Sequence, residues 1–267
     1  MASIENKQKI LNELKAKKFL KIISGIQNYD KQKTLNVAMA AELGEASALD
    51  ICDDLEIIKA VRASVQLPLF VSSIDPEKLF KAQEAGADVL EIGNYESFYK
   101  ASKMFTPKEI LEIVRAIKQK ISANVLLCCT VPSTLELENQ IKLSKELLML
   151  GVDILQTEGF ALEIPASDRK DKEYTDILNA SSTLANTIAL SKALKGSYII
   201  TASGINSTTL PFAFAAGGNG IGVGTYIYSC TSQIQMTERV QELVELLGSK
   251  EQKIVKENFG KKAVAVK

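Results

Sequence analysis

The sequence predicts an α/β protein, a (β/α)8 TIM barrel preceded by an N-terminal lead-in helix. Three observations support this fold. Short apolar strands alternate eight times with helical segments of ten or more residues, which favours parallel βαβ units. The 267 residues are close to the ~250 typical of one such barrel. A glycine that ends a helix also precedes strands two, four, six and eight, which is a weak internal repeat. An open, doubly wound parallel sheet is the alternative.

The chain begins with a predicted amphipathic helix. Residues 4–18 place isoleucine and leucine at helical spacing among lysines, so we expect one face of this helix to cover one mouth of the core. A helix lying on a membrane surface is the other interpretation. Glu5 and Glu13 and the modest length of the segment disfavour it.

The remaining elements follow in order. The predicted strands are 19–24, 46–51, 69–73, 89–92, 125–130, 154–157 and two strands within 198–226. The predicted helices are 30–43, 53–65, three helices that open at cap signals, a long helix that ends near residue 194, and 237–247. The three cap signals are Asp75-Pro76, the capping box Thr106 to Glu109 and the capping box Ser133 to Glu136.

We expect one domain over residues 1–250 and a frayed tail over 251–267, where lysines are frequent and periodicity is weak. An inserted segment, 94–105, separates the fourth strand from its helix. The connection 159–170 is long for a compact domain, so it is a candidate lid.

Composition excludes several functions. Lysine plus arginine and aspartate plus glutamate number 32 each, so the net charge is 0 and no basic face for nucleic acid is expected. No secretory signal opens the chain and no apolar run approaches ~20 residues, which predicts a soluble intracellular protein without membrane insertion.

The chain has no histidine, which excludes His-based acid–base catalysis, Ser-His and Cys-His nucleophiles and His metal ligands. The four cysteines form neither a C-x-x-C motif nor a disulfide framework, as expected in a reducing compartment. Cys128 or Cys129 as a nucleophile is disfavoured, since no histidine could activate it.

The stretch Tyr198–Tyr226 contains two short apolar strands that each end in glycine. Glycine lets backbone N–H groups approach a ligand, and a helix start that Asn206 or Ser207 could cap adds unpaired N–H donors. Phosphate sites after strands seven and eight recur in such barrels. The alternative is two glycine turns that only let the sheet close. The predicted phosphate-binding residues are Ser203, Gly204, Gly222, Gly224 and Thr225.

The repeat and strand alternation predict that Asp50, Glu91, Gln156 and Gly222 share one inward-facing layer of the barrel. A buried carboxylate needs a partner, a proton or a metal. Lys21, inside an otherwise apolar first strand, is the natural partner.

We predict catalytic roles for Lys21, Asp50, Glu91 and Glu158. Lys21 would be a base, a Schiff-base amine or a fixed positive charge, and the carboxyl groups would move protons. The alternatives are an ion pair of Lys21 with Asp50 or Glu91 that only neutralises the core, and a solvated loop position for Glu158. No metal site is predicted, although the carboxylates could instead hold Mg²⁺. Predicted substrate contacts at the same mouth are Ser73, Asn94, Thr130, Gln156 and Thr201, and Ser72 would lie beside them.

Several motifs together resemble one known family. They are Lys21-Ile-Ile-Ser-Gly-Ile26, Leu67-Pro-Leu-Phe-Val-Ser-Ser73, Ala85-Gly-Ala-Asp-Val-Leu-Glu-Ile-Gly-Asn94, Ser97-Phe-Tyr99, Thr130-Val-Pro132, Gln156-Thr-Glu-Gly159, Thr201-Ala-Ser-Gly-Ile205 and Gly220-Ile-Gly-Val-Gly224. The chain resembles the conserved hypothetical chloroplast reading-frame family of algal plastids and cyanobacteria, a domain of unknown function, over nearly all of residues 17–247.

The resemblance implies a (β/α)8 barrel related to phosphate-binding barrels, located in a plastid stroma or a cyanobacterial cytoplasm. It implies no activity. Residues 160–165 depart from the Gly/Ser/Pro-rich loop of the family, which removes support for a ligand role there.

Two hypotheses of function follow. The first is a lyase, aldolase or isomerase that acts on a small phosphorylated metabolite, and flavin mononucleotide could occupy the same phosphate site. The second is a non-catalytic barrel that serves as a regulatory or assembly partner of a plastid or cyanobacterial complex. A homo-oligomer is compatible with either hypothesis.

Overall fold

The eight strands form a closed parallel barrel in the computed structural model, which describes residues 3–93, 95–99, 101–159 and 171–248. Each strand pairs in parallel with the next in sequence, and the last pairs with the first through Lys21 opposite Gly222. The predicted barrel is therefore confirmed, and the open sheet is excluded. The strands are β1 Phe19–Ile23, β2 Ala48–Ile51, β3 Leu69–Ser73, β4 Val89–Ile92, β5 Leu126–Val131, β6 Ile154–Thr157, β7 Tyr198–Ala202 and β8 Gly220–Val223.

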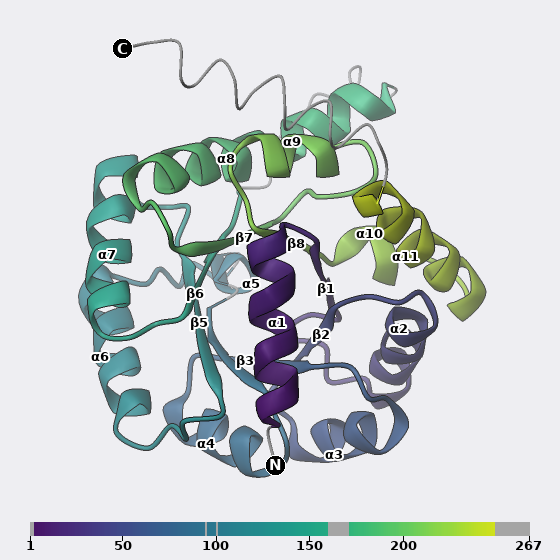
Figure 1. The fold of residues 1–267 in the computed structure, drawn as a ribbon, viewed down its shortest axis with the longest axis horizontal. Coiled ribbons are helices and arrows are strands. Elements are labelled where there is room, and N and C mark those ends of the chain that lie inside the picture. Colours follow the sequence, from purple (N-terminus) through teal and green to yellow (C-terminus); the bar gives the residue numbers. More distant parts are fainter. Residues whose placement is uncertain (1–2, 94, 100, 160–170, 249–267) are drawn as a thin grey trace.

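Helices surround the barrel (Figure 1) and bury their apolar faces against the outward-facing strand residues. Two predicted caps are confirmed: Asp75 accepts from the first backbone N–H groups of its helix, and Thr106 and Glu109 form a capping box. The helices are α1 Ile4–Ala16, α2 Lys31–Leu43, α3 Leu55–Ser64, α4 Pro76–Glu84, α5 Glu96–Tyr99, α6 Pro107–Lys118, α7 Leu137–Met149, α8 Lys172–Ala193, α9 Leu210–Ala215, α10 Thr225–Tyr228 and α11 Gln233–Gly248.

Some predicted helix starts were wrong. The capping box at Ser133 does not form, because α7 starts only at Leu137 and has no side-chain cap. The chain first turns, with the Leu135 N–H donating to the Pro132 carbonyl, while the Ser133 N–H is bonded to Glu158. After β7, Asn206 accepts from two N–H groups of a similar turn, so α9 also starts later than predicted.

Helix α1 closes the N-terminal end of the barrel and lies across it in Figure 1. Ile10 and Leu14 are fully buried and pack with the lowest inward-facing residues, among them Phe19, Phe70 and Ile154. Burying one such aliphatic side chain contributes about 1.5–3 kcal/mol to stability. The predicted covering helix is thus confirmed as part of the core.

Some predictions fall on residues outside this description, namely the tail 251–267, most of the 159–170 connection and Asn94. Within the described ranges, none of the helices combines the length and the apolar character that crossing a membrane requires.

Candidate functional site

A lysine and two carboxylates form the centre of a polar layer inside the barrel. Lys21 Nζ lies 3.1 Å from Asp50 Oδ2 and 2.5 Å from Glu91 Oε2. All three side chains are essentially inaccessible to solvent. The inward positions of β1, β2 and β4 meet here because side chains alternate along each strand. The structure thus brings together the lysine and carboxylates that the sequence predicted as partners.

Neighbouring strands complete this layer with uncharged donors. Ser72 Oγ donates to Asp50 Oδ1 at 2.7 Å, and Gln156 Nε2 donates to Glu91 Oε1 at 2.7 Å. Thr130 Oγ1 lies 3.4 Å from the same Glu91 oxygen. These bonds satisfy carboxylate oxygens that would otherwise be costly to bury.

The charge of Lys21 is fixed by its partners. Burial alone lowers the pKa of a lysine, but Asp50 and Glu91 outweigh this effect and hold the pKa of Lys21 above its ordinary value. Burial likewise raises the pKa of the Asp50 carboxyl, and the attraction of Lys21 opposes that shift. A Schiff base requires the neutral amine, so this geometry favours the ion pair and the fixed positive charge among the predicted roles of Lys21.

Above this layer, a cavity of about 550 Å³ opens at the C-terminal ends of β7, β8 and β1. Gln156 and Gly222 also line it, so Gln156 joins the cavity to the buried charges through its bond to Glu91. This is the end of a (β/α)8 barrel where active sites lie. All five predicted phosphate-binding residues line the cavity: Ser203, Gly204, Gly222, Gly224 and Thr225.

The glycines that line this cavity differ in whether close packing leaves room for a Cβ atom. Gly204 has φ +73°, and a Cβ there would lie 2.6 Å from the Asn179 carbonyl oxygen, so close packing against α8 requires it. At Gly222 a Cβ would come within 3.0 Å of Ala202 and Ile23. At Gly224 no atom would be nearer than 3.4 Å, which is ordinary contact. Close packing therefore requires glycine at position 204 but not at position 224.

Glu158 follows β6 and is almost fully buried at the edge of the same cavity. Its carboxylate accepts from the backbone N–H groups of Glu96 and Ser133, at 3.1 and 3.2 Å, and from the Tyr99 hydroxyl. Burial raises the pKa of Glu158 to about 7, while these hydrogen bonds oppose the shift. It is therefore not a solvated loop acid, and a carboxyl group with this pKa suits proton transfer at neutral pH.

The predicted substrate contacts separate into different places. Thr201 lies on the outer side of β7, where its hydroxyl is 3.0 Å from that of Thr187 on α8. Ser73 donates to Asp53 at 2.5 Å beside a second cavity of about 400 Å³. Thr130 belongs to the buried layer. Of the residues predicted for substrate contact that the structure describes, Gln156 alone lines the larger cavity.

The carboxylates do not converge as a cation site would require. Asp50 and Glu91 are both bonded to Lys21, whereas Glu158 is held apart by its own donors. Within the described ranges, no group of three or more acidic or cysteine side chains is arranged to hold a metal ion. Burial also raises the pKa of the Cys128 and Cys129 thiols, which disfavours the thiolate nucleophile.

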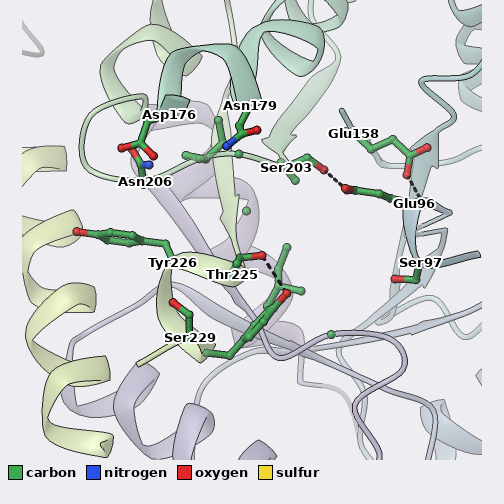
Figure 2. Close-up of a pocket in the computed structure, with 18 of the residues that line it drawn as sticks. Glu96, Ser97, Glu158, Asp176, Asn179, Ser203, Asn206, Thr225, Tyr226 and Ser229 are labelled. Atoms are coloured by element: carbon green, nitrogen blue, oxygen red, sulfur yellow. Dashed lines mark hydrogen bonds between the residues drawn. The ribbon is translucent and has the colours of Figure 1, made fainter. Parts of the chain in front are cut away.

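Charged residues that sequence reasoning missed give this cavity two different walls. Glu96 of α5 lies on one side with Glu158, and Tyr226 and Asp176 lie on the other (Figure 2). Arg239 stacks on the Tyr226 ring at 4.6 Å from its centroid. Lys172 and Asp176 form an ion pair at 2.8 Å, and both basic residues line the cavity.

A sequence signal existed for only some of these residues. Glu96 lies in the insertion 94–105, which interrupts the alternation of strand and helix and so marked the segment as unusual. Lys172 opens a helix directly after the long 159–170 connection. Arg239 lies within an ordinary amphipathic helix and carried no such signal.

Comparisons with a family model and with individual relatives lead to the same group of proteins. Residues 4–253 match the family model described as "Protein of unknown function (DUF561)". A relative from Cyanidium caldarium, "Uncharacterized protein ycf23", is 37% identical over 225 residues, which cover 84% of this chain and 88% of the relative. The protein of the same name from Pyropia yezoensis is 36% identical over 235 residues, covering 88% and 84%.

Solved structures are similar in fold at low sequence identity. Tryptophan synthase subunit alpha from Legionella pneumophila str. Paris has a TM-score of 0.62 at 12% identity, covering 91% of this chain and 98% of that structure. 3-Hexulose-6-phosphate synthase has a TM-score of 0.58 at 16% identity, covering 85% and 99%. These similarities establish the fold alone.

Proposed function

We propose that this chain, which belongs to the DUF561 family, is an enzyme that binds a small phosphorylated metabolite in the cavity above β7, β8 and β1. The reaction would be of the lyase, aldolase or isomerase type. One observation carries the proposal: the five residues predicted to hold phosphate line a single cavity, which rests on a buried layer of charge. Of these residues, Gly224 is small where packing does not require it, as a backbone that contacts a ligand would be.

In this proposal the phosphate binds near Gly224 and Thr225, on the side of the cavity that Arg239 and Lys172 line. Arginine is well suited to phosphate, because its planar guanidinium group donates two parallel hydrogen bonds. Coulomb attraction from both basic side chains adds to this binding.

Glu158 is the proposed proton-transfer group, since its pKa of about 7 supplies both protonation states near neutral pH. Lys21 is the proposed fixed charge. Below the cavity floor, its ammonium group would hold Glu91 in place, and Glu91 in turn would position the Gln156 side chain that lines the cavity.

The comparisons with known proteins also support a phosphorylated ligand and a plastid or cyanobacterial location. The name of the structural neighbour 3-hexulose-6-phosphate synthase refers to a sugar phosphate. The relatives named above come from algae, in line with a plastid stroma or a cyanobacterial cytoplasm as the proposed location. Homo-oligomerisation stays a prediction.

A thermal-shift experiment tests the proposal. The purified protein is heated with inorganic phosphate, a panel of sugar phosphates or flavin mononucleotide. A ligand at 100 times its Kd adds about 2.7 kcal/mol to stability, which corresponds to a Tm rise of roughly 5 °C or more for a chain of this size.

The decisive variant is Gly224→Asp, which places a carboxylate in the cavity without a steric clash. It should abolish the Tm rise through like-charge repulsion. Gly248→Asp is the matched control, since a Cβ there meets no atom within 4 Å, and it should respond like the native protein. If no phosphorylated compound stabilises the native protein, the proposed enzyme is rejected.

A second candidate is a non-catalytic regulatory or assembly partner. The observation that favours it is the closure of the layer around Lys21, whose charge is neutralised out of reach of solvent. A folded, unresponsive native protein in the same screen is the result expected of this candidate.

A further inference from the structure

Glu96 spans the mouth of the barrel to reach the end of β7, on the side of the cavity away from Arg239 and Lys172. It belongs to α5, which follows β4, yet its Oε2 accepts a hydrogen bond from Ser203 Oγ, at the end of β7, at 2.9 Å. Figure 2 shows its carboxylate directed toward Ser203 and away from Glu158. Glu96 is partly buried and lines the cavity.

The backbone around Glu96 is held in place from below. Its own N–H donates to Glu158 Oε2 at 3.1 Å, and the Tyr99 hydroxyl donates to the other oxygen of the same carboxylate. The Tyr95 ring packs on Phe105 with centroids 4.8 Å apart. These contacts fix α5 at both ends, so the Glu96 carboxylate is a positioned group rather than a freely moving surface side chain.

The charge of this carboxylate restricts what can bind beside it. An ionised carboxylate is only a hydrogen-bond acceptor, so it pairs with a hydroxyl or amine and repels another anion. The basic residues Arg239 and Lys172 belong to the opposite wall, beside Tyr226 and Asp176. A ligand that satisfies both walls carries its anionic group at one end and hydrogen-bond donors at the other.

We propose that Glu96 is a specificity-determining residue that selects a phosphorylated polyol or sugar. It accepts a hydrogen bond from a hydroxyl group of the ligand and rejects ligands with a carboxylate at that position. This inference rests on the proposed function, because it assumes that phosphate occupies the opposite side of the cavity.

Titration calorimetry with two closely related ligands tests the inference. Glycerol 3-phosphate and 3-phosphoglycerate differ in that a carboxylate replaces a terminal hydroxymethyl group. The native protein should bind glycerol 3-phosphate at least about tenfold more tightly, since a misplaced charge typically costs more than 1.4 kcal/mol. Glu96→Gln should reduce the preference to about threefold or less, mainly by binding 3-phosphoglycerate more tightly, because an amide can donate to the carboxylate.

Two further variants test whether the preference depends specifically on the charge of Glu96. Ser97→Ala changes the neighbouring residue, which also lines the cavity, and should keep the native preference. Ser203→Ala removes the donor that Glu96 now contacts but leaves the charge of Glu96 in place, so it should retain the native preference between the two ligands. Circular dichroism establishes that each variant is folded.

Binding of inorganic phosphate distinguishes a wrong assignment of Glu96 from failure of the proposed function. If phosphate binds the native protein and Glu96→Gln leaves the preference unchanged, the assignment of Glu96 is wrong and the phosphate site stands. If phosphate and both esters fail to bind the folded native protein, the proposed function and this inference are rejected together.

Discussion

The two ends of this barrel are built from the same strands and differ in chemistry. At the N-terminal end the inward residues are apolar, and α1 closes the opening with Ile10 and Leu14. At the C-terminal end the inward positions are small or polar and leave a cavity of about 550 Å³. The difference shows that core side chains fill one end, whereas the other end leaves an open cavity.

The layer around Lys21 separates these two ends. Phe70, one layer below, places its ring 4.7 Å from Lys21 Nζ, and Gln156 reaches the cavity above. A buried ion pair contributes little net stability compared with apolar residues of the same volume, yet breaking it is costly. Mutations in the layer and at each end therefore have different expected effects.

The largest expected effect comes from removing the charge of Lys21. Lys21→Met leaves Asp50 and Glu91 buried without their cation, and unpaired buried charges of this kind cost about 3–5 kcal/mol. Urea unfolding at pH 7 measures the loss.

The matching control for this prediction removes the negative charges as well. Combining Lys21→Met with Asp50→Asn and Glu91→Gln should recover most of the lost stability, because the donors from Ser72 and Gln156 can bond to the new amide oxygens. A single variant within about 1 kcal/mol of the native protein would show that the layer tolerates its carboxylates unpaired.

The next effect is expected at the closed end. Leu14→Ala creates a cavity beneath α1 and should cost about 2–5 kcal/mol of unfolding free energy, while the Kd for phosphate stays the same. Ile4→Ala, at a position that is 69% exposed on the same helix, should change stability by about 0.5 kcal/mol or less. Equal losses for both variants would mean that α1 does not complete the core.

The smallest expected effect is a pH dependence at the open end. Because folding raises the pKa of Glu158 from 4.5 to about 7, the folded state favours the protonated carboxyl. This contribution is fully present below about pH 4.5 and is lost as the pH rises through about 7. At 1.36 kcal/mol per pKa unit, this shift of about 2.5 units amounts to no more than about 3.4 kcal/mol.

Urea unfolding of native protein and Glu158→Gln between pH 4.5 and 8 isolates this contribution. The variant lacks the titrating group, so the stability difference between the two proteins should change with pH in the stated direction. The raised pKa of Asp50 affects both proteins alike and cancels in that difference. Parallel pH profiles would show that folding does not raise the pKa of Glu158.

The sequence predicted the barrel well because its signals are local and repeated. Eight apolar strands, glycines at helix ends and caps such as Thr106 each identify one element without knowledge of the others. The pairing of Lys21 with Asp50 and Glu91 was also predictable, since strand alternation places all three inside and buried charges require partners.

The remaining differences arise from contacts between distant segments. Ser133 does not cap α7, since its N–H is bonded to Glu158, 25 residues away. Thr201 was assigned to the mouth, but its side chain points outward, because strand alternation places its neighbours Ile200 and Ala202 inside the barrel. Glu96 reaches Ser203 across 107 residues of sequence, and no local pattern encodes that approach.

Helix α1 also has a consequence for the order in which the protein folds. It precedes all eight strands in the chain, but its backbone accepts a hydrogen bond from Asn219, 205 residues later, and its buried side chains belong to a core cluster with residues of seven strands. Such distant contacts form slowly, because the intervening chain must first be closed into a loop. We therefore expect α1 to dock onto the barrel late in folding, after the strands have closed into a ring.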